Sequence, residues 1–190
     1  MKSKICFIIF GCILASCSDN TNFQKHPNDV KKDSIFSKKD TCDFLLEEVK
    51  RFDKILLTSN SINNQIAEKS VKVFYDFYLN CKNDSLSPVF LLKAGQVSLS
   101  IRKYTDAKNL FTKVIAEFPA FKNRAGAMFL LAQLYDETSI LNDESIAKKI
   151  YEQIIKEYPN SSYANDSKAC IRNFGKSDEE LVRKFLKDSK

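Results

Sequence analysis

Two successive segments of the chain, 88–119 and 125–159, repeat one pattern of helical periodicity. Each holds two runs in which apolar residues recur at intervals of three and four, and each ends at a proline, Pro119 or Pro159. This spacing lines apolar side chains along one face of a helix, and a proline ends the helix that reaches it. Because a lone helix pair cannot bury its apolar faces, the repeat predicts helix pairs that stack on one another.

Helical periodicity extends to both sides of these segments and covers residues 40–190, which we expect to form one domain. Further helix pairs are expected at 41–80 and 161–188. Local signals in the sequence agree with these helices. Pro88 suits the first turn of a helix, and Gly175 suits the position after a helix end. Ser177 and Glu180 form a capping box that begins an eighth helix, which ends near Lys187. The expected fold is all-α, an α-solenoid of about four antiparallel helix pairs. A hydrophobic fraction of 44% with four glycines and four prolines suits such a domain.

The residue types at fixed places in both segments resemble the tetratricopeptide repeat (TPR) family. They are Gly95, Ala107, Phe111 and Pro119 in the first segment, and Ala132, Tyr135, Ala147, Tyr151 and Pro159 in the second. Small residues let paired helices approach closely, and an aromatic side chain fills the gap between them. The turn within the second segment, from Thr138 to Glu144, is about three residues longer than the family pattern. The resemblance implies a scaffold for protein–protein interaction and not an enzyme.

The same resemblance implies a binding groove, because the first helix of each TPR lines a concave surface. Its groove positions fall on Val89, Leu92, Gln96 and Leu99, and then on Gly126, Phe129, Gln133 and Asp136. Both repeats thus place an apolar residue at one level and a glutamine at the next. This favours a partner with an apolar helix or extended segment, whose backbone the glutamines could hydrogen-bond. The alternative is that neighbouring helices cover Leu92 and Phe129, because apolar residues at helical spacing are usually core.

The first seventeen residues are typical of a bacterial secretory signal that ends at a cysteine. Two lysines precede an apolar run over residues 5–14, which is shorter than the roughly 20 residues of a membrane-spanning helix. The sequence from Leu14 to Cys17, Leu-Ala-Ser-Cys, resembles the lipobox of bacterial lipoproteins. This resemblance implies cleavage of a signal peptide, residues 1–16, and acylation of Cys17 with palmitate. An ordinary signal peptide with a chance cysteine, or a short apolar anchor that stays uncut, is the alternative.

A lipoprotein of this kind carries its folded domain on a tether. Residues 17–39 are rich in Asn, Asp, Lys and Ser without apolar periodicity, which predicts a flexible segment. Together with the repeats, this resembles the envelope TPR lipoproteins, among them the accessory lipoprotein of the outer-membrane β-barrel assembly machinery. Ser18 follows Cys17, where aspartate retains lipoproteins of some bacteria in the inner membrane, so we expect the outer membrane. The implied partners are envelope proteins in outer-membrane assembly, and the membrane itself through the lipid anchor.

Six cysteines leave two alternatives for the folded domain. Cys6 and Cys12 would leave with the signal peptide, and Cys17 would be acylated. Cys42 opens the first expected helix of the domain and Cys81 closes the second, so the two ends meet in an antiparallel pair. A disulfide between these two cysteines, with Cys170 free and buried, is therefore one alternative in an oxidising envelope. Three buried free thiols are the other, because free cysteine is among the most buried residue types.

Residues 40–190 offer no set of side chains for catalysis or metal binding. The only histidine, His26, lies in the tether, so a nucleophile would lack its usual base, and no cluster of His, Cys and Asp has metal-ligand spacing. We expect no cofactor and no small-molecule substrate. The formal charge of +6 is mild for an exported protein, and we expect no nucleic-acid partner. A basic surface favours one alternative function, the binding of peptidoglycan or an anionic glycan.

Overall fold

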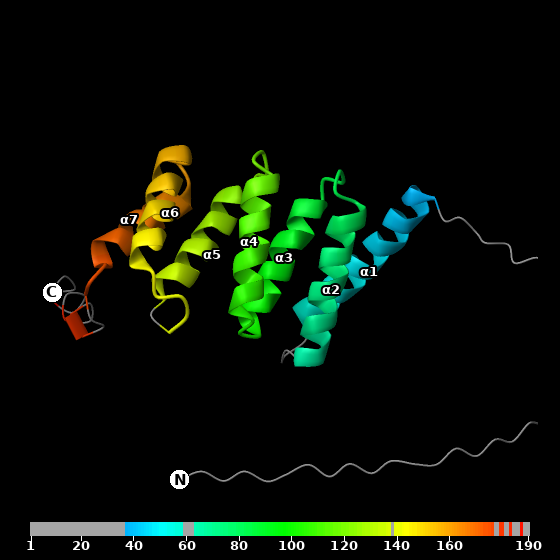
Figure 1. Cartoon of the computed structure of the whole chain (residues 1–190), viewed down its shortest axis with the longest axis horizontal. Coiled ribbons are helices and arrows are strands. Elements are labelled where there is room, and N and C mark those ends of the chain that lie inside the picture. The colour runs from blue at the N-terminus through cyan, green and yellow to red at the C-terminus, as the bar shows by residue number, and fades with distance from the viewer. Residues whose placement is uncertain are drawn as a thin grey trace, which may run out of the picture. The chain divides into compact units, whose positions relative to one another are not determined.

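The computed structural model describes residues 37–58, 63–137 and 139–176, together with residues 179, 180, 183 and 187. Over these residues the chain forms seven α-helices and no strand, which confirms the expected all-α, TPR-like fold. The helices are α1 (Lys38–Thr58), α2 (Asn64–Asn80), α3 (Ser87–Ser100), α4 (Tyr104–Glu117), α5 (Arg124–Asp136), α6 (Glu144–Glu157) and α7 (Ser162–Asn173). In Figure 1 they stand in a row that follows the order of the chain.

Some predictions concern residues outside the described ranges. The chain divides into two units, Met1–Ile35 and Phe36–Lys190, and the signal peptide, Cys17 and the tether up to residue 36 lie outside the described part. Most of the eighth helix, expected from Ser177 to about Lys187, also lies outside it, as does Thr138 in the long turn. These remain predictions.

The ends of the helices follow the local signals of the sequence. Pro88 lies in the first turn of α3, where its missing N–H costs no hydrogen bond. The side chains of Asn63, Asp143 and Ser161 accept hydrogen bonds from backbone N–H groups in the first turns of α2, α6 and α7. Gly175 follows α7 with a φ of 71°, a left-handed conformation that glycine adopts at little cost. Short-range chemistry therefore sets where these helices begin and end.

Each helix packs mainly against the helices before and after it in the chain, and α5 also contacts α7. Close packing within the α3–α4 pair depends on Gly95. A methyl group built on Gly95 would lie 2.5 Å from Cε1 of Phe111, whose ring is fully buried in the gap between the two helices. Ala107, also fully buried, is the second small residue of this pair. The small and aromatic residues thus have the packing role that the sequence predicts.

The buried apolar side chains form two clusters. The larger cluster runs from α1 to α5 and includes Val49, Phe74, Leu91 and Phe111. The smaller cluster joins α5, α6 and α7 around Tyr151, which is fully buried. Ile115, Tyr135 and Ile150 pack against both clusters, so the core extends along the row of helices, as stacked repeats require.

Side chains also connect alternate helices, but not everywhere. The Lys93 ammonium of α3 forms an ion pair with the Asp53 carboxylate of α1. The rings of Phe129 in α5 and Tyr163 in α7 lie 5.6 Å apart. Within the described residues, no hydrogen bond, ion pair or ring contact joins α3 to α5. Apolar packing serves this middle part of the row instead, because buried residues of α3 and α5 belong to the same larger cluster.

Candidate functional site

Three of the predicted groove positions on α3 are accessible. Gln96 is exposed, and Val89 and Leu99 are half-buried. No described residue forms a hydrogen bond with the Gln96 amide group, which leaves its donors and acceptor available. These three residues place a polar group beside apolar surface on one helix.

Leu92 does not lie on an open groove, which corrects its place among the groove residues and agrees with the alternative that neighbouring helices cover it. Its side chain is 4% exposed and belongs to the larger core cluster, because α3 packs against both α2 and α4. Gly126, the equivalent of Val89 in the second repeat, is buried as well. A methyl group built there would lie 2.4 Å from Oδ1 of Asn123, at the start of α5, and 2.8 Å from the hydroxyl of Tyr163 in α7. At both positions, neighbouring helices occupy the space that a partner would need.

Phe129 lies at the border between groove and core. Its ring is half-buried and lies 5.6 Å from the ring of Tyr151 and 5.6 Å from that of Tyr163. Such offset or tilted aromatic pairs stabilise the packing of the helices that carry them. Phe129 therefore joins α5 to α6 and α7 and offers a partner only part of its surface.

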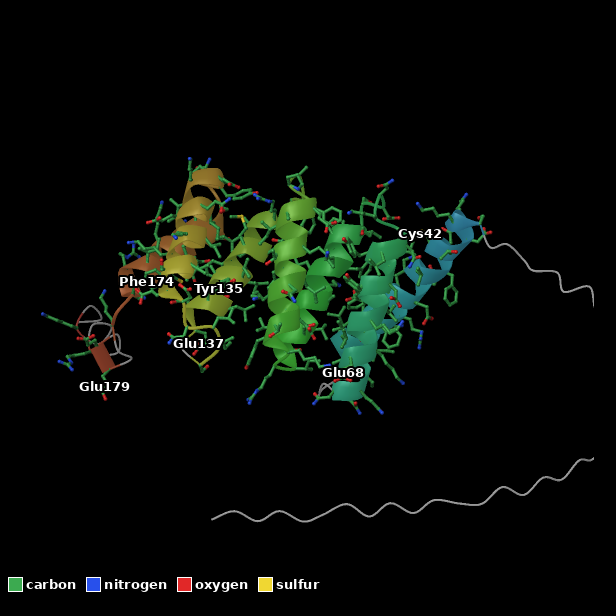
Figure 2. All side chains as sticks on the ribbon, in the orientation of Figure 1. Cys42, Glu68, Tyr135, Glu137, Phe174 and Glu179 are labelled. Carbon is green, nitrogen blue, oxygen red and sulfur yellow. A yellow bond between two sulfur atoms is a disulfide. The ribbon has the colours of Figure 1, made fainter. Side chains whose placement is uncertain are left out.

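The last two predicted groove residues, Gln133 and Asp136, line a cavity of about 540 Å³ at the ends of α5 and α7. The side chain of Gln133 is exposed and that of Asp136 is half-buried. Figure 2 labels Glu137 and Phe174, which lie at this end of the helical row. The other lining residues are Glu137, Asn142, Glu144, Tyr151, Cys170, Asn173, Phe174, Gly175 and Lys176. Val89, Gln96 and Leu99 do not line this cavity.

Burial raises the pKa of three of the groups that line this cavity. Burial raises the pKa of the Asp136 carboxyl, and the neighbouring carboxylates of Glu144 and Glu137 raise it further. The Tyr151 hydroxyl donates a hydrogen bond to Oδ2 of Asp136 at 3.4 Å, which acts in the opposite direction. Burial also raises the pKa of the Tyr151 hydroxyl and of the half-buried Cys170 thiol. Tyr151 therefore stays protonated and orients the Asp136 carboxylate.

Groove positions alone did not identify Tyr151, Cys170 and Phe174 as lining residues. Tyr151 comes from α6, and the other two come from the end of α7 and the residue after it. Tyr151 holds an aromatic core position of the repeat, and the apolar character of the other two gave no sign of a cavity. Only the packing of α7 against α5 and α6 brings them beside Asp136.

A cluster of charged side chains surrounds Glu117, the last residue of α4. Its carboxylate accepts hydrogen bonds or ion-pair contacts from the Tyr78 hydroxyl at 2.7 Å, from Lys82 at 2.5 Å and from Lys113 at 3.3 Å. Both ammonium groups lie 5.7 Å from the centre of the Tyr78 ring. These partners lower the pKa of Glu117 to about 2. The two ammonium groups share the one carboxylate of Glu117, an arrangement typical of a structural cluster.

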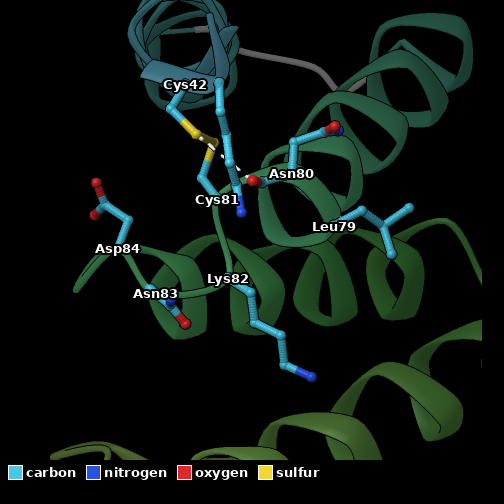
Figure 3. A pocket seen from close by; sticks show the side chains of 8 residues that line it. Cys42, Leu79, Asn80, Cys81, Lys82, Asn83 and Asp84 are labelled. Atoms are coloured by element: carbon cyan, nitrogen blue, oxygen red, sulfur yellow. Dashed lines mark hydrogen bonds between the residues drawn. A yellow bond between two sulfur atoms is a disulfide. The ribbon is translucent and has the colours of Figure 1, made fainter.

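Beside this cluster, Cys42 and Cys81 form a disulfide, with their Cα atoms 5.7 Å apart. Figure 3 shows the bond at the edge of a cavity of about 280 Å³, which Lys82, Asn83 and Asp84 also line. Of the two alternatives for the cysteines, the structure therefore contains the disulfide. Cys170 is free, as expected, but half-buried.

The described part of the chain gives no sign of a metal site or a membrane span. Within it, no group of three or more His, Cys, Asp and Glu side chains is arranged to hold a metal ion. None of α1 to α7 combines the length and the apolar character that crossing a bilayer requires.

Comparison with known families identifies one part of the chain. Residues 126–161 match the tetratricopeptide repeat family. The match covers most of α5, the following turn and α6, and ends at Ser161, which caps α7. The chain therefore contains a TPR, and its helical row is a TPR-like solenoid, a fold that generally binds proteins. No curated protein matches the chain.

Proposed function

We propose that this protein is a non-catalytic scaffold of the bacterial cell envelope that binds protein partners along α3 and α5. One observation carries the proposal: Gln96 and Gln133 occupy equivalent positions in successive repeats and both are exposed. The TPR match supports the general mode of action, which is protein binding through a repeat surface. The proposed occupant is a helix or extended segment that lies across the two first helices.

The chemistry of the surface supports such an occupant. An amide side chain both donates and accepts hydrogen bonds, so Gln96 and Gln133 can bond backbone groups of a partner at two levels. The half-buried Val89 and Leu99 provide apolar surface beside Gln96. A partner with apolar side chains on one side and accessible backbone groups on the other would match this surface.

We further propose that Cys17 is acylated and holds the protein at the outer membrane, where it serves outer-membrane protein assembly. The support is the sequence pattern of residues 1–17, a short positive region and an apolar run that ends in a lipobox. Two or more acyl chains anchor a protein stably, because each buried methylene contributes about 0.8 kcal/mol. The segment between Cys17 and α1 would then act as the tether.

Site-directed photo-crosslinking in cells tests the binding surface. A photoreactive amino acid would replace Gln96 or Gln133, and in a third variant Gln153, which is exposed on α6. Gln153 is the matched control, since it is a glutamine on the second helix of the same repeat as Gln133. We expect the first two variants to give the same crosslinked proteins and the third to give none of them. Crosslinks of equal yield from all three positions would contradict the proposed surface.

Metabolic labelling tests the anchor separately. Cells fed labelled palmitate should incorporate the label into the wild-type protein and not into the Cys17→Ala variant. The wild-type protein should then fractionate with the outer membrane. Unlabelled wild-type protein, or label that persists in the variant, would show that Cys17 is not the anchor.

A further inference from the structure

The cavity beside Asp136 carries an excess of negative charge in a chain that is basic overall. Asp136, Glu137 and Glu144 line it, and Lys176 is the single basic residue in its lining. The Lys176 ammonium donates a hydrogen bond to the backbone carbonyl of Arg172. This acceptor is neutral, so Lys176 keeps its positive charge, and the three carboxylates still outnumber it in the lining. The whole chain has a formal charge of +6. This local reversal of charge favours a cationic ligand.

The Asp136 carboxylate lacks a counter-ion among the described residues. Its one hydrogen-bond donor there is the Tyr151 hydroxyl, at the long distance of 3.4 Å. Its charged neighbours, Glu137 and Glu144, repel its negative charge. A half-buried carboxylate in such surroundings is costly to ionise, and an approaching cation would remove that cost.

The shape and lining of the cavity favour an organic cation over a metal ion. A volume of about 540 Å³ accommodates a whole side chain, and the three carboxylates are not arranged as a metal site in the described part of the chain. The half-buried ring of Phe174 also lines the cavity. Aromatic rings attract cations at their faces, and a planar guanidinium can also stack on them.

We propose that this cavity receives an arginine side chain of the bound partner, with the Asp136 carboxylate as its counter-ion and the Phe174 ring as a wall. A carboxylate can accept two parallel N–H donors from a guanidinium, which an ammonium cannot supply in the same plane. Tyr151 is a positioning residue, because its fully buried ring holds the hydroxyl that orients Asp136. This proposal rests on the proposed function, since the arginine would belong to a segment that continues along α5 past Gln133.

A pair of small ligands tests the cavity without a partner protein. N-acetylarginine amide and N-acetylcitrulline amide have nearly the same shape, but citrulline is neutral. Each would be titrated into isotope-labelled full-length protein, and binding would be followed by NMR at the backbone amides of Asp136, Glu137 and Phe174. We expect saturable shifts with the arginine amide and about tenfold weaker binding of the citrulline amide, which corresponds to about 1.4 kcal/mol.

Two variants locate the binding. Asp136→Asn keeps the shape of the side chain and should lose the preference for arginine over citrulline. Asp43→Asn, at an exposed position of α1, is the matched control and should keep it. The absence of saturable shifts in the wild-type protein, or equal affinity for the two amides, would overturn the proposal even if the Asp136 variant does not fold.

The outcome separates this proposal from the proposed function. If the arginine amide fails to bind while Gln96 and Gln133 still crosslink to partners, only the assignment of the cavity fails. If it binds while those positions give no crosslinks, the proposed scaffold function fails and the cavity remains a cation site.

Discussion

A single missing methyl group determines how closely α3 and α4 approach. Gly95 gives the Phe111 ring the space that any other residue would take, since an added Cβ would lie 2.5 Å from the ring. The pattern of small and aromatic residues predicted this contact because it lies within one repeat, between residues of fixed spacing. Leu92, three residues earlier, shows the limit of such patterns. Its burial depends on how two neighbouring helices cover α3, which its position in the repeat does not determine.

Replacing Gly95 with alanine should destabilise the protein. Alanine is the better helix former by about 1 kcal/mol, but overpacking against a buried ring costs typically 1–3 kcal/mol. We expect the packing cost to be larger, because Phe111 is fully buried and cannot move freely. Urea unfolding would measure the difference, with Gln96→Ala at the neighbouring exposed position as the control. A Gly95→Ala variant more stable than wild type would show that helix propensity dominates.

Glu117 should make the stability of the protein depend on acid pH. Its pKa is about 2 in the folded protein, below the ordinary value of 4.5. The ionised side chain therefore stabilises the fold at neutral pH, and this contribution is lost as the pH falls from about 4.5 toward 2. Because the carboxylate is partly exposed, we expect a contribution on the order of 1–2 kcal/mol.

The variant Glu117→Gln isolates this contribution. At pH 7 its free energy of unfolding should be lower than that of the wild-type protein, and the difference between them should shrink as the pH approaches 3. Denaturant unfolding at a series of pH values would measure both proteins. A difference that stays constant over this range would show that the ionisation of Glu117 is not the source of the stability.

At the scale of helices, the sequence predicts where a helix begins or ends more readily than which cavities form between helices. Pro88 and Gly175 act through the backbone at or near their own positions, so their roles follow from local sequence. The cavity beside Asp136 instead requires the end of α7 to pack near the end of α5, and nothing in the repeat pattern specifies that contact. The cysteines fall between these cases. Periodicity placed Cys42 and Cys81 at adjacent helix ends, but it did not distinguish a bonded pair from two buried thiols.

The Cys42–Cys81 disulfide should stabilise the pairing of α1 with α2. It links residues 39 positions apart, and closing a loop of that length in the unfolded chain is worth about 2–4 kcal/mol. We expect a reductant, or the double variant Cys42→Ala with Cys81→Ala, to lower the free energy of unfolding by this amount. The reductant should have no further effect on the double variant. Peptide mapping without reduction should recover the two cysteines in one linked species, and separate unlinked peptides would contradict the bond.

At the scale of the whole helical domain, stability should be local. The two apolar clusters meet at α5, with α1–α4 on one side and α6–α7 on the other. In stacked repeats each unit contacts mainly its neighbours. A substitution that removes packing from one cluster should therefore destabilise mainly the helices that contribute to that cluster. The sequence predicted this arrangement through its repeats, although the clear matches covered only two of the helix pairs.

Truncating one fully buried residue in each cluster tests this locality. Ile154→Ala in α6 and Val114→Ala in α4 both remove side-chain atoms from positions that are 0% exposed. An isoleucine-to-alanine change in a core costs about 2–5 kcal/mol. Hydrogen exchange should show the larger loss of protection in α5–α7 for Ile154→Ala and in α3–α4 for Val114→Ala. Equal loss along all helices in both variants would show that the domain unfolds as one unit.

The links between alternate helices differ in kind along the row. The ion pair of Asp53 with Lys93 ties α1 to α3, and the rings of Phe129 and Tyr163 tie α5 to α7. Residues of α3 and α5 belong together to the larger apolar cluster, and no hydrogen bond, ion pair or ring contact joins these two helices in the described residues. Added salt should therefore weaken the link between α1 and α3, since ions screen a partly exposed ion pair, while the apolar packing of α3 and α5 carries no charge to screen.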